Sequence, residues 1–228
     1  MLAERLQADE LMDDPALGVE TYHAVLADLA KVNRVTFAYR PTLSFLRRAV
    51  GGRERFRLLD VGFGDGDMLR RIAQWAKRRR IAAELVGIDL NSRSRAAAEA
   101  IPSPGAPIEY LSGDYATLAG GGFDCVISSL VAHHMSETEL SGFLRFMEAE
   151  AAAGWFVNDL HRHALAHAAW PLLADTMGWH PIVRIDGHTS IARSFRPGEW
   201  RAILDREGLA QARARRWFPF RLCVERFR

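Results

Sequence analysis

Short apolar runs alternate with longer amphipathic stretches over most of this sequence, beginning near residue 56. We interpret the apolar runs as buried strands at residues 56–61, 84–89, 108–111, 123–128 and 155–158. The intervening and following stretches predict helices at residues 68–80, 93–100, 137–152, 163–177 and 197–207, and residues 215–227 close the chain as a β-hairpin or two strands. Strands that alternate with helices favour a doubly wound (Rossmann-like) α/β fold, a mostly parallel seven-stranded sheet with helices on both faces.

The first 50 residues have a helical pattern instead. Leu26, Leu29, Val32 and Val35 recur at helical spacing, and Pro41 suits the first turn of a second helix. We therefore predict an N-terminal helical extension or cap at residues 1–50 and the α/β domain at residues 51–228.

A glycine-rich loop follows the first predicted strand. Gly62, Gly64 and Gly66 stand at alternate positions, so the backbone can turn sharply and approach a ligand. The dinucleotide-binding pattern G-x-G-x-x-G requires glycine at position 67, which is Asp67 here. Asp60 adds a second carboxylate, and carboxylates disfavour a pyrophosphate but favour a cationic ligand that carries an amine and a sulfonium.

Acidic residues also follow the next two strands. Asp89 ends the second strand, where a carboxylate can accept both hydroxyls of a ribose. Asp114 follows the third strand, where it can accept the exocyclic amine of an adenine while Tyr115 stacks on the ring. Each acid alone would be an ordinary turn or cap residue, but together with the glycine loop they indicate a nucleoside-containing cofactor.

These motifs resemble the class I S-adenosylmethionine-dependent methyltransferases over residues 56–217. Asp60 and the glycines match the first motif of that family, Asp89 matches its ribose-binding acid, and Gly113 with Asp114 matches its adenine-binding pair. The resemblance implies S-adenosyl-L-methionine as the cofactor. The predicted cofactor site consists of Asp60, Gly62, Phe63, Gly64, Gly66, Asp89, Leu90, Asn91, Gly113, Asp114, Tyr115, Ser129 and Leu130. Phe63 departs mildly from the family, many members of which carry a small residue or cysteine there.

Histidines follow the fourth and fifth strands, at the same predicted edge of the sheet. We predict that His133 is a general base and that Asp159 orients it, with His134 and His161 as substitutes if the register differs. The spacing of these histidines and Asp159 fits no zinc pattern, and a single carboxylate provides too few oxygen ligands for magnesium, so we predict no metal.

Residues 180–195 form a long polar stretch that we interpret as a loop acting as a lid, with a turn at residues 186–188. The residues predicted to contact substrate are Arg162, His188, Ser190 and Arg193. The apolar residues available for a substrate pocket are Phe37, Tyr39, Trp170 and Met177.

A narrower resemblance rests on residues 11–15 (LMDDP), 133–134, 158–162 and 186–190. These segments are similar to a bacterial group of methyltransferases associated with aromatic polyketide, phenol and quinone pathways. The resemblance implies O-methylation of a phenolic or quinol-type small molecule. A C-methyltransferase of a quinone or phenol precursor is the first alternative. An RNA methyltransferase, suggested by the arginine-rich end of the chain, and a non-catalytic cofactor-binding protein are less favoured, and Asp67 makes a nicotinamide dehydrogenase the least favoured.

The bulk properties limit the partners. The net charge is only +2, so we expect no nucleic-acid partner. No apolar run is long enough to span a bilayer, and the first residues carry no apolar stretch typical of a secretory signal. Cys125 and Cys223 each lie in an apolar run and read as core residues. We expect a cytoplasmic protein that does not bind membranes, with a homodimer as an open possibility.

Overall fold

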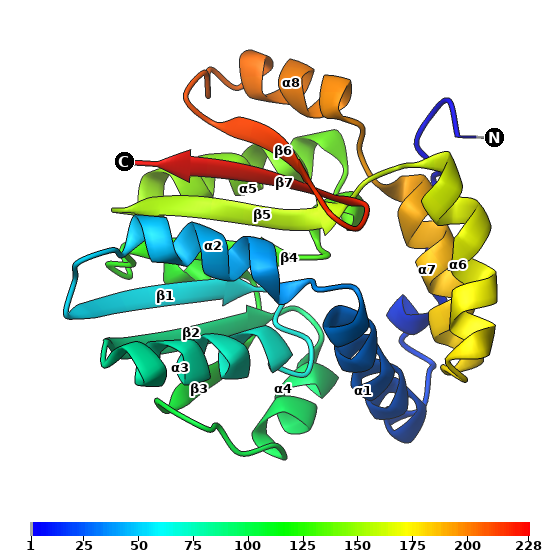
Figure 1. Ribbon diagram of the computed structural model, residues 1–228, viewed down its shortest axis with the longest axis horizontal. Coiled ribbons are helices and arrows are strands. Elements are labelled where there is room, and N and C mark those ends of the chain that lie inside the picture. The colour runs from blue at the N-terminus through cyan, green and yellow to red at the C-terminus, as the bar shows by residue number, and fades with distance from the viewer. Residues whose placement is uncertain (1) are drawn as a thin grey trace.

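The computed structural model describes residues 2–228 as one seven-stranded sheet covered by helices (Figure 1). The strand order across the sheet is β3-β2-β1-β4-β5-β7-β6. The strands are β1 (Arg55–Val61), β2 (Ala82–Asp89), β3 (Ile108–Ser112), β4 (Cys125–Ser129), β5 (Gly154–Leu160), β6 (Arg213–Trp217) and β7 (Arg221–Phe227). The first five strands are parallel, and β7 runs antiparallel between β5 and β6. The predicted doubly wound fold is therefore confirmed.

The strand order reverses beside β1, since β2 pairs with one edge of β1 and β4 with the other. In doubly wound sheets such a reversal leaves a crevice at the carboxyl ends of the strands, where ligands bind. Val61, Asp89, Ser129 and Leu160 end β1, β2, β4 and β5 and lead into loops at this edge.

Side chains alternate along each strand, so the sheet has two apolar faces. The helices are α1 (Val19–Val35), α2 (Tyr39–Ala49), α3 (Asp67–Arg79), α4 (Ser92–Glu99), α5 (Glu137–Glu150), α6 (Ala164–Thr176), α7 (Pro181–Arg193) and α8 (Pro197–Arg206). Phe45 of α2, Ile72 of α3 and Ala98 of α4 pack on one face, and Phe143 of α5 and Trp200 of α8 pack on the other.

Helix α2 packs directly on the sheet although it precedes the first strand. The ring of Phe45 stacks on that of Phe156 in β5, with 5.0 Å between centroids. Asn158 of β5 donates from its side-chain amide to the Ala38 carbonyl at 2.8 Å, which ties the entry of α2 to the central sheet. The division of the chain at residue 50 stays a prediction.

Helices α1, α6 and α7 form a separate layer beyond the carboxyl ends of the parallel strands (Figure 1). Their shared apolar cluster contains Val25 from α1, Ala174 from α6 and Val183 from α7, with Trp179 between the last two helices. We call these three helices the cap. None of the helices among residues 2–228 is both long and apolar enough to cross a membrane.

The prediction of a loop at residues 180–195 was wrong, because α7 occupies most of that stretch. Pro181 stands in the first turn, where its missing N–H costs nothing, and His180 accepts the Ile182 N–H as a cap. The predicted turn at residues 186–188 lies inside this helix. A Cβ at Gly187 would come 2.3 Å from the Trp170 ring, so glycine serves close packing of α6 on α7 and not a turn.

The N-terminal segment, residues 2–18, lies against the cap. Both carboxylate oxygens of Asp186 accept backbone N–H groups, from Leu11 at 2.8 Å and Met12 at 2.9 Å, at the start of the 3₁₀ helix η1 (Leu11–Asp13). Arg162 donates to the carbonyl of Leu2, and Arg5 donates to that of His133. These bonds hold the segment across the carboxyl edge of the sheet.

Candidate active site

A cavity of about 560 Å³ opens between the carboxyl edge of the sheet and the cap. Its sheet side is formed by the loops after β1, β2, β3 and β4. Its other walls come from α1, α6, α7 and the N-terminal segment. The predicted edge of the sheet is therefore also where the described residues enclose a space large enough for a cofactor and a small acceptor.

The glycine loop after β1 has the backbone shape that its sequence predicts. Gly62 and Gly66 have φ values of 77° and 78°, in the left-handed region that favours glycine. A Cβ at Gly62 would lie 2.3 Å from a Val131 methyl, and one at Gly66 would lie 2.4 Å from the Tyr110 hydroxyl. The chain then enters α3, whose free N–H groups and positive dipole end face the loop.

Asp60 is buried at the end of β1 and lines the cavity. Its Oδ1 has no hydrogen-bond partner among the described residues. Burial raises the pKa of this carboxyl well above its usual range, and the nearby Asp67 and Asp89 raise it further. An unpartnered buried carboxylate beside two other acids fits a cationic ligand, because such a ligand relieves both the burial cost and the repulsion.

Asp89 links two of the loops that line the cavity. Its Oδ2 accepts the Gly64 N–H at 2.9 Å, and its Oδ1 accepts the Asn91 N–H at 2.9 Å. Each oxygen retains a lone pair that a ribose hydroxyl could donate to. Burial raises the pKa of Asp89, and these backbone donors oppose the rise.

The remaining predicted cofactor residues divide into two groups. Those that line the cavity are Gly62, Phe63, Gly64, Leu90, Asn91, Gly113, Tyr115, Ser129 and Leu130. Leu90 is 78% exposed, so its side chain offers a free apolar surface at this wall. Gly66 and Asp114 lie outside the lining, and Asp114 instead caps the 3₁₀ helix η2 (Tyr115–Leu118) by accepting the Ala116 N–H.

The structure brings His133 and Asp159 together at the same cavity. His133 lies in the 3₁₀ helix η3 (Ala132–His134) after β4, and Asp159 lies near the end of β5. Asp159 Oδ1 is 2.7 Å from His133 Nδ1, and Asp159 Oδ2 accepts the His133 backbone N–H at 3.0 Å. Both side chains are buried, and His133 lines the cavity while Asp159 lies behind it.

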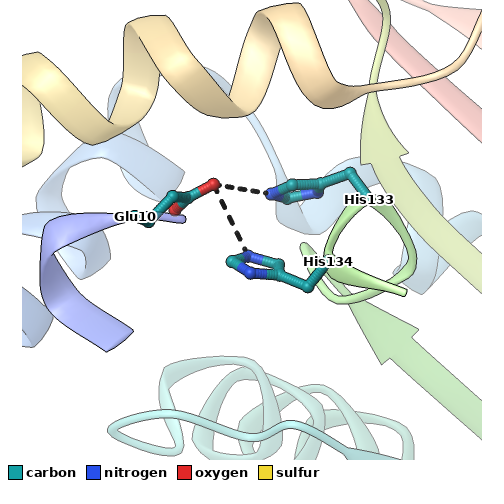
Figure 2. A group of neighbouring side chains, drawn as sticks. All are labelled: Glu10, His133 and His134. Atoms are coloured by element: carbon teal, nitrogen blue, oxygen red, sulfur yellow. Dashed lines mark ion pairs between the residues drawn. The ribbon is translucent and has the colours of Figure 1, made fainter. Parts of the chain in front are cut away.

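Two acidic residues of the N-terminal segment complete this corner, and sequence reasoning missed them. Glu10 Oε1 lies 3.4 Å from His133 Nε2 and 3.7 Å from His134 Nε2 (Figure 2). Asp13 Oδ2 lies 3.1 Å from His134 Nδ1. In the sequence Asp13 belongs to the LMDDP motif, which supports only a resemblance, and Glu10 directly precedes that motif; nothing local to either residue indicates a contact more than a hundred residues away.

The charges at this corner stabilise one another. Burial of His133 opposes its charged form, but Asp159 and Glu10 outweigh that cost and raise its pKa to about 9. Burial would raise the pKa of Glu10 and of Asp159, yet the facing His133 lowers both. The resting corner therefore holds an imidazolium between two carboxylates at neutral pH.

Other predicted residues lie away from the cavity. His161 does not line it, and burial together with Arg216 lowers the pKa of His161 to about 4. Arg162 is buried and donates to the Ser194 carbonyl at 2.8 Å as part of the scaffold. His188 packs on His167 with 3.5 Å between ring centroids.

Arg193 also lies outside the lining, although its Nη1 comes within 3.9 Å of Glu10 Oε1. Ser190 does line the cavity, and its hydroxyl donates to Glu10 at 2.7 Å. Of the four predicted substrate contacts, therefore, the structure brings only Ser190 to the cavity wall.

The cap side of the cavity is mostly apolar. Its side chains include Met12 of the N-terminal segment, Leu29 of α1, Trp170 and Leu173 of α6, and Val183 of α7. Of the four apolar residues named from the sequence, only Trp170 belongs to this wall; Phe37, Tyr39 and Met177 do not.

Comparison with known proteins agrees with this architecture. Residues 58–151, which run from β1 to the end of α5, match the model of the methyltransferase domain family. This segment is therefore similar to a methyltransferase domain. Among the curated proteins, none matches the chain.

Solved structures of methyltransferases share the fold over nearly the whole chain. Magnesium protoporphyrin IX methyltransferase from Synechocystis PCC 6803 with bound SAH is 18% identical, with a TM-score of 0.58 over 94% of this chain and 90% of that chain. The plantazolicin methyltransferase BpumL with SAH is 12% identical, with a TM-score of 0.65 over 91% and 87%. Human N-acetylserotonin methyltransferase with SAM is 13% identical, with a TM-score of 0.63 over 92% of this chain and 56% of that one.

These matches confirm the predicted methyltransferase with its class I, Rossmann-like fold. The bound SAM and SAH in the solved structures agree with the predicted cofactor. These three methyltransferases are named for a magnesium protoporphyrin, plantazolicin and N-acetylserotonin, which differ widely in size. The fold therefore leaves the acceptor open.

Proposed function

We propose that this protein transfers the methyl group of S-adenosyl-L-methionine to a phenolic or quinol-type hydroxyl of a small aromatic acceptor. The observation that carries the proposal is the His133–Asp159 pair, which faces the same cavity as the glycine loop and Asp89. One end of the cavity then holds the cofactor, and the other holds the acceptor beside a base.

The cofactor end supports this assignment through its charges. Asp60 and Asp89 suit the cationic and ribose parts of S-adenosylmethionine, and the exposed Leu90 offers an apolar surface for the adenine. When bound, the cofactor supplies a methyl group on a sulfonium, an electrophile that needs only alignment and an oxygen nucleophile.

The acceptor end supports an aromatic molecule with a hydroxyl. Trp170, Leu173 and Val183 give an apolar wall suited to a ring, and His133 gives a polar point at its edge. Asp159 faces Nδ1 of His133, so the neutral imidazole, whose share grows as the pH approaches its pKa of about 9, has its free Nε2 toward the cavity and can take the hydroxyl proton there. The acceptor oxygen occupies the place near Nε2 where Glu10 now lies, so Glu10 has to shift.

Transfer of a labelled methyl group from S-adenosylmethionine to a panel of phenols and quinols tests the proposal. We expect His133→Ala to lower turnover about 10²–10⁴-fold, the usual contribution of a general base, while cofactor affinity changes little. His163→Ala is the matched control, since His163 caps α6 outside the cavity. Near-normal turnover of His133→Ala at every pH contradicts the base assignment.

C-methylation of a quinone or phenol precursor remains the alternative. It uses the same cofactor site, and His133 would then generate a phenolate whose ring carbon receives the methyl group. Product analysis distinguishes the two, because an O-methyl and a C-methyl product of one acceptor differ in NMR shift.

Cys125 and Cys223 are free and buried, which agrees with the expected reducing, cytoplasmic location.

A further inference from the structure

The geometry of Glu10, His133 and His134 points to a binding site for a divalent transition-metal ion at the acceptor end of the cavity (Figure 2). One oxygen and two nitrogens of these residues lie within 4.8 Å of one another. A metal ion here differs from the sequence-based expectation of no metal. Glu10, which comes from a distant part of the chain, is the ligand that sequence spacing could not supply.

The distances are those of ligands around a small cation. Zinc binds imidazole nitrogen and carboxylate oxygen at about 2.0–2.2 Å, so two ligands of a tetrahedral site lie about 3.3–3.5 Å apart. Glu10 Oε1 is 3.4 Å from His133 Nε2 and 3.7 Å from His134 Nε2. Both separations require only small side-chain shifts to close on one ion.

Each of the two imidazoles is also held from behind by a carboxylate. Asp159 faces Nδ1 of His133 at 2.7 Å, and Asp13 faces Nδ1 of His134 at 3.1 Å. Ser190 donates to Oε1 of Glu10, the oxygen that faces both imidazoles, at 2.7 Å, and this oxygen keeps a second lone pair. A carboxylate behind each imidazole directs Nε2 toward the shared point, as in histidine–metal sites whose outer residues orient the ligands.

A second observation indicates a missing ligand at that point. His133 Nε2 is buried and has no hydrogen-bond partner among residues 2–228, since Glu10 Oε1 faces it at 3.4 Å without forming one. All three residues line the cavity, so an ion bound there keeps an open position toward it. A metal ion satisfies the orphaned nitrogen without rearranging the fold.

The net charge of the side chains around Glu10, His133 and His134 is compatible with one bound divalent cation. The carboxylates of Glu10, Asp13 and Asp159 face the corner, and the guanidinium groups of Arg5 and Arg193 oppose them. With both imidazoles neutral, this set carries one excess negative charge, which a divalent cation changes to one excess positive charge. Because a histidine must be deprotonated at the nitrogen that binds a metal, metal and protons compete for the site.

The effect of a metal ion on catalysis rests on the proposed function. A metal ion on His133 Nε2 occupies the atom that would take the acceptor proton. Metal binding is therefore expected to inhibit methyl transfer reversibly, and a chelator is expected to restore it.

Calorimetric titration of the chelator-treated full-length protein with Zn²⁺, without cofactor or acceptor, tests the site directly. We expect one strong site, and Co²⁺ in its place should give the visible absorption of a bound, low-symmetry ion. Glu10→Gln and His134→Ala each should weaken Zn²⁺ binding at least about 100-fold, and Asp13→Asn about 10-fold. His188→Ala, which breaks the His167–His188 pair outside the site, is the matched control and should bind as the parent does.

The proposal is overturned if no strong Zn²⁺ site is found, or if Glu10→Gln and His134→Ala bind Zn²⁺ as tightly as the parent protein. Circular dichroism of each variant shows that a loss of binding does not come from unfolding. Turnover is measured separately with Zn²⁺ saturating: normal turnover would contradict the base assigned to His133, while the binding titration alone decides the metal site.

Discussion

Replacing Asp159 by asparagine should change how stability depends on pH, because the carboxylate holds a proton on His133. Asparagine keeps the size of the side chain and removes its charge. Asp159 is fully buried, and its Oδ1 lies 2.7 Å from His133 Nδ1. The variant therefore removes the larger of the two carboxylate contributions that raise the pKa of His133.

The magnitude follows from the shift of His133. Its pKa is about 9 in the folded protein and about 6.5 in an unfolded chain, a difference of about 2.5 units or about 3 kcal/mol. Because the folded pKa is raised, this stabilisation is fully present below about pH 6.5 and is lost as the pH rises through about 9. Asp159→Asn should lose most of it.

Urea unfolding followed by tryptophan fluorescence measures the effect in the six-tryptophan protein, with a chelator present. At each pH, the free energy of unfolding of Asp159→Asn is subtracted from that of the parent. This difference should be about 2–3 kcal/mol larger at pH 6 than at pH 10. Other titrating groups cancel in this difference. A difference that stays constant across this range would refute the charged pair.

Three further predictions concern the cavity. Asp89→Ala should weaken S-adenosylmethionine binding by about 1.5–3 kcal/mol in calorimetry, because charge-assisted hydrogen bonds are lost, whereas Glu84→Ala, at the exposed opposite end of β2, should bind normally. Equal affinities would show that Asp89 does not face the cofactor. Gly62→Ala should lower the free energy of unfolding by about 1–3 kcal/mol, since the φ of Gly62 is 77° and an added Cβ would meet Val131. Gly142→Ala, in an open helical position of α5, should raise the free energy of unfolding by about 0.5–1 kcal/mol. A change of the same sign in both variants would contradict this explanation. The ratio kcat/KM should rise with pH up to about 9, as His133 loses its proton, and a flat profile would mean that no base of this pKa limits the reaction.

The sequence predicted the elements that local pattern determines. The five parallel strands, the glycine loop and Asp89 are predictable because hydrophobic period and turn chemistry act over a few residues. The pairing of His133 with Asp159 was also predicted, since both follow strands that the fold places side by side.

The features that the sequence did not predict depend on contacts between residues far apart in the chain. Glu10 reaches His133 only because Asp186 and Arg162 anchor the N-terminal segment across the sheet edge. Residues 180–195 are predicted as a loop because their polar side chains obscure the helical hydrophobic pattern. Gly187 is predicted to form a turn, whereas in the structure it makes room for Trp170. No sequence pattern within the N-terminal segment or within residues 180–195 indicates the distant residues that these segments contact.

Equilibrium binding of S-adenosylmethionine and of NAD, measured by calorimetry on the same preparation, decides which cofactor the glycine loop accepts. We expect one molecule of S-adenosylmethionine bound per chain and no binding of NAD, because Asp60 and Asp67 favour a cation beside the glycine loop and disfavour a pyrophosphate. Binding of NAD without binding of S-adenosylmethionine would contradict it.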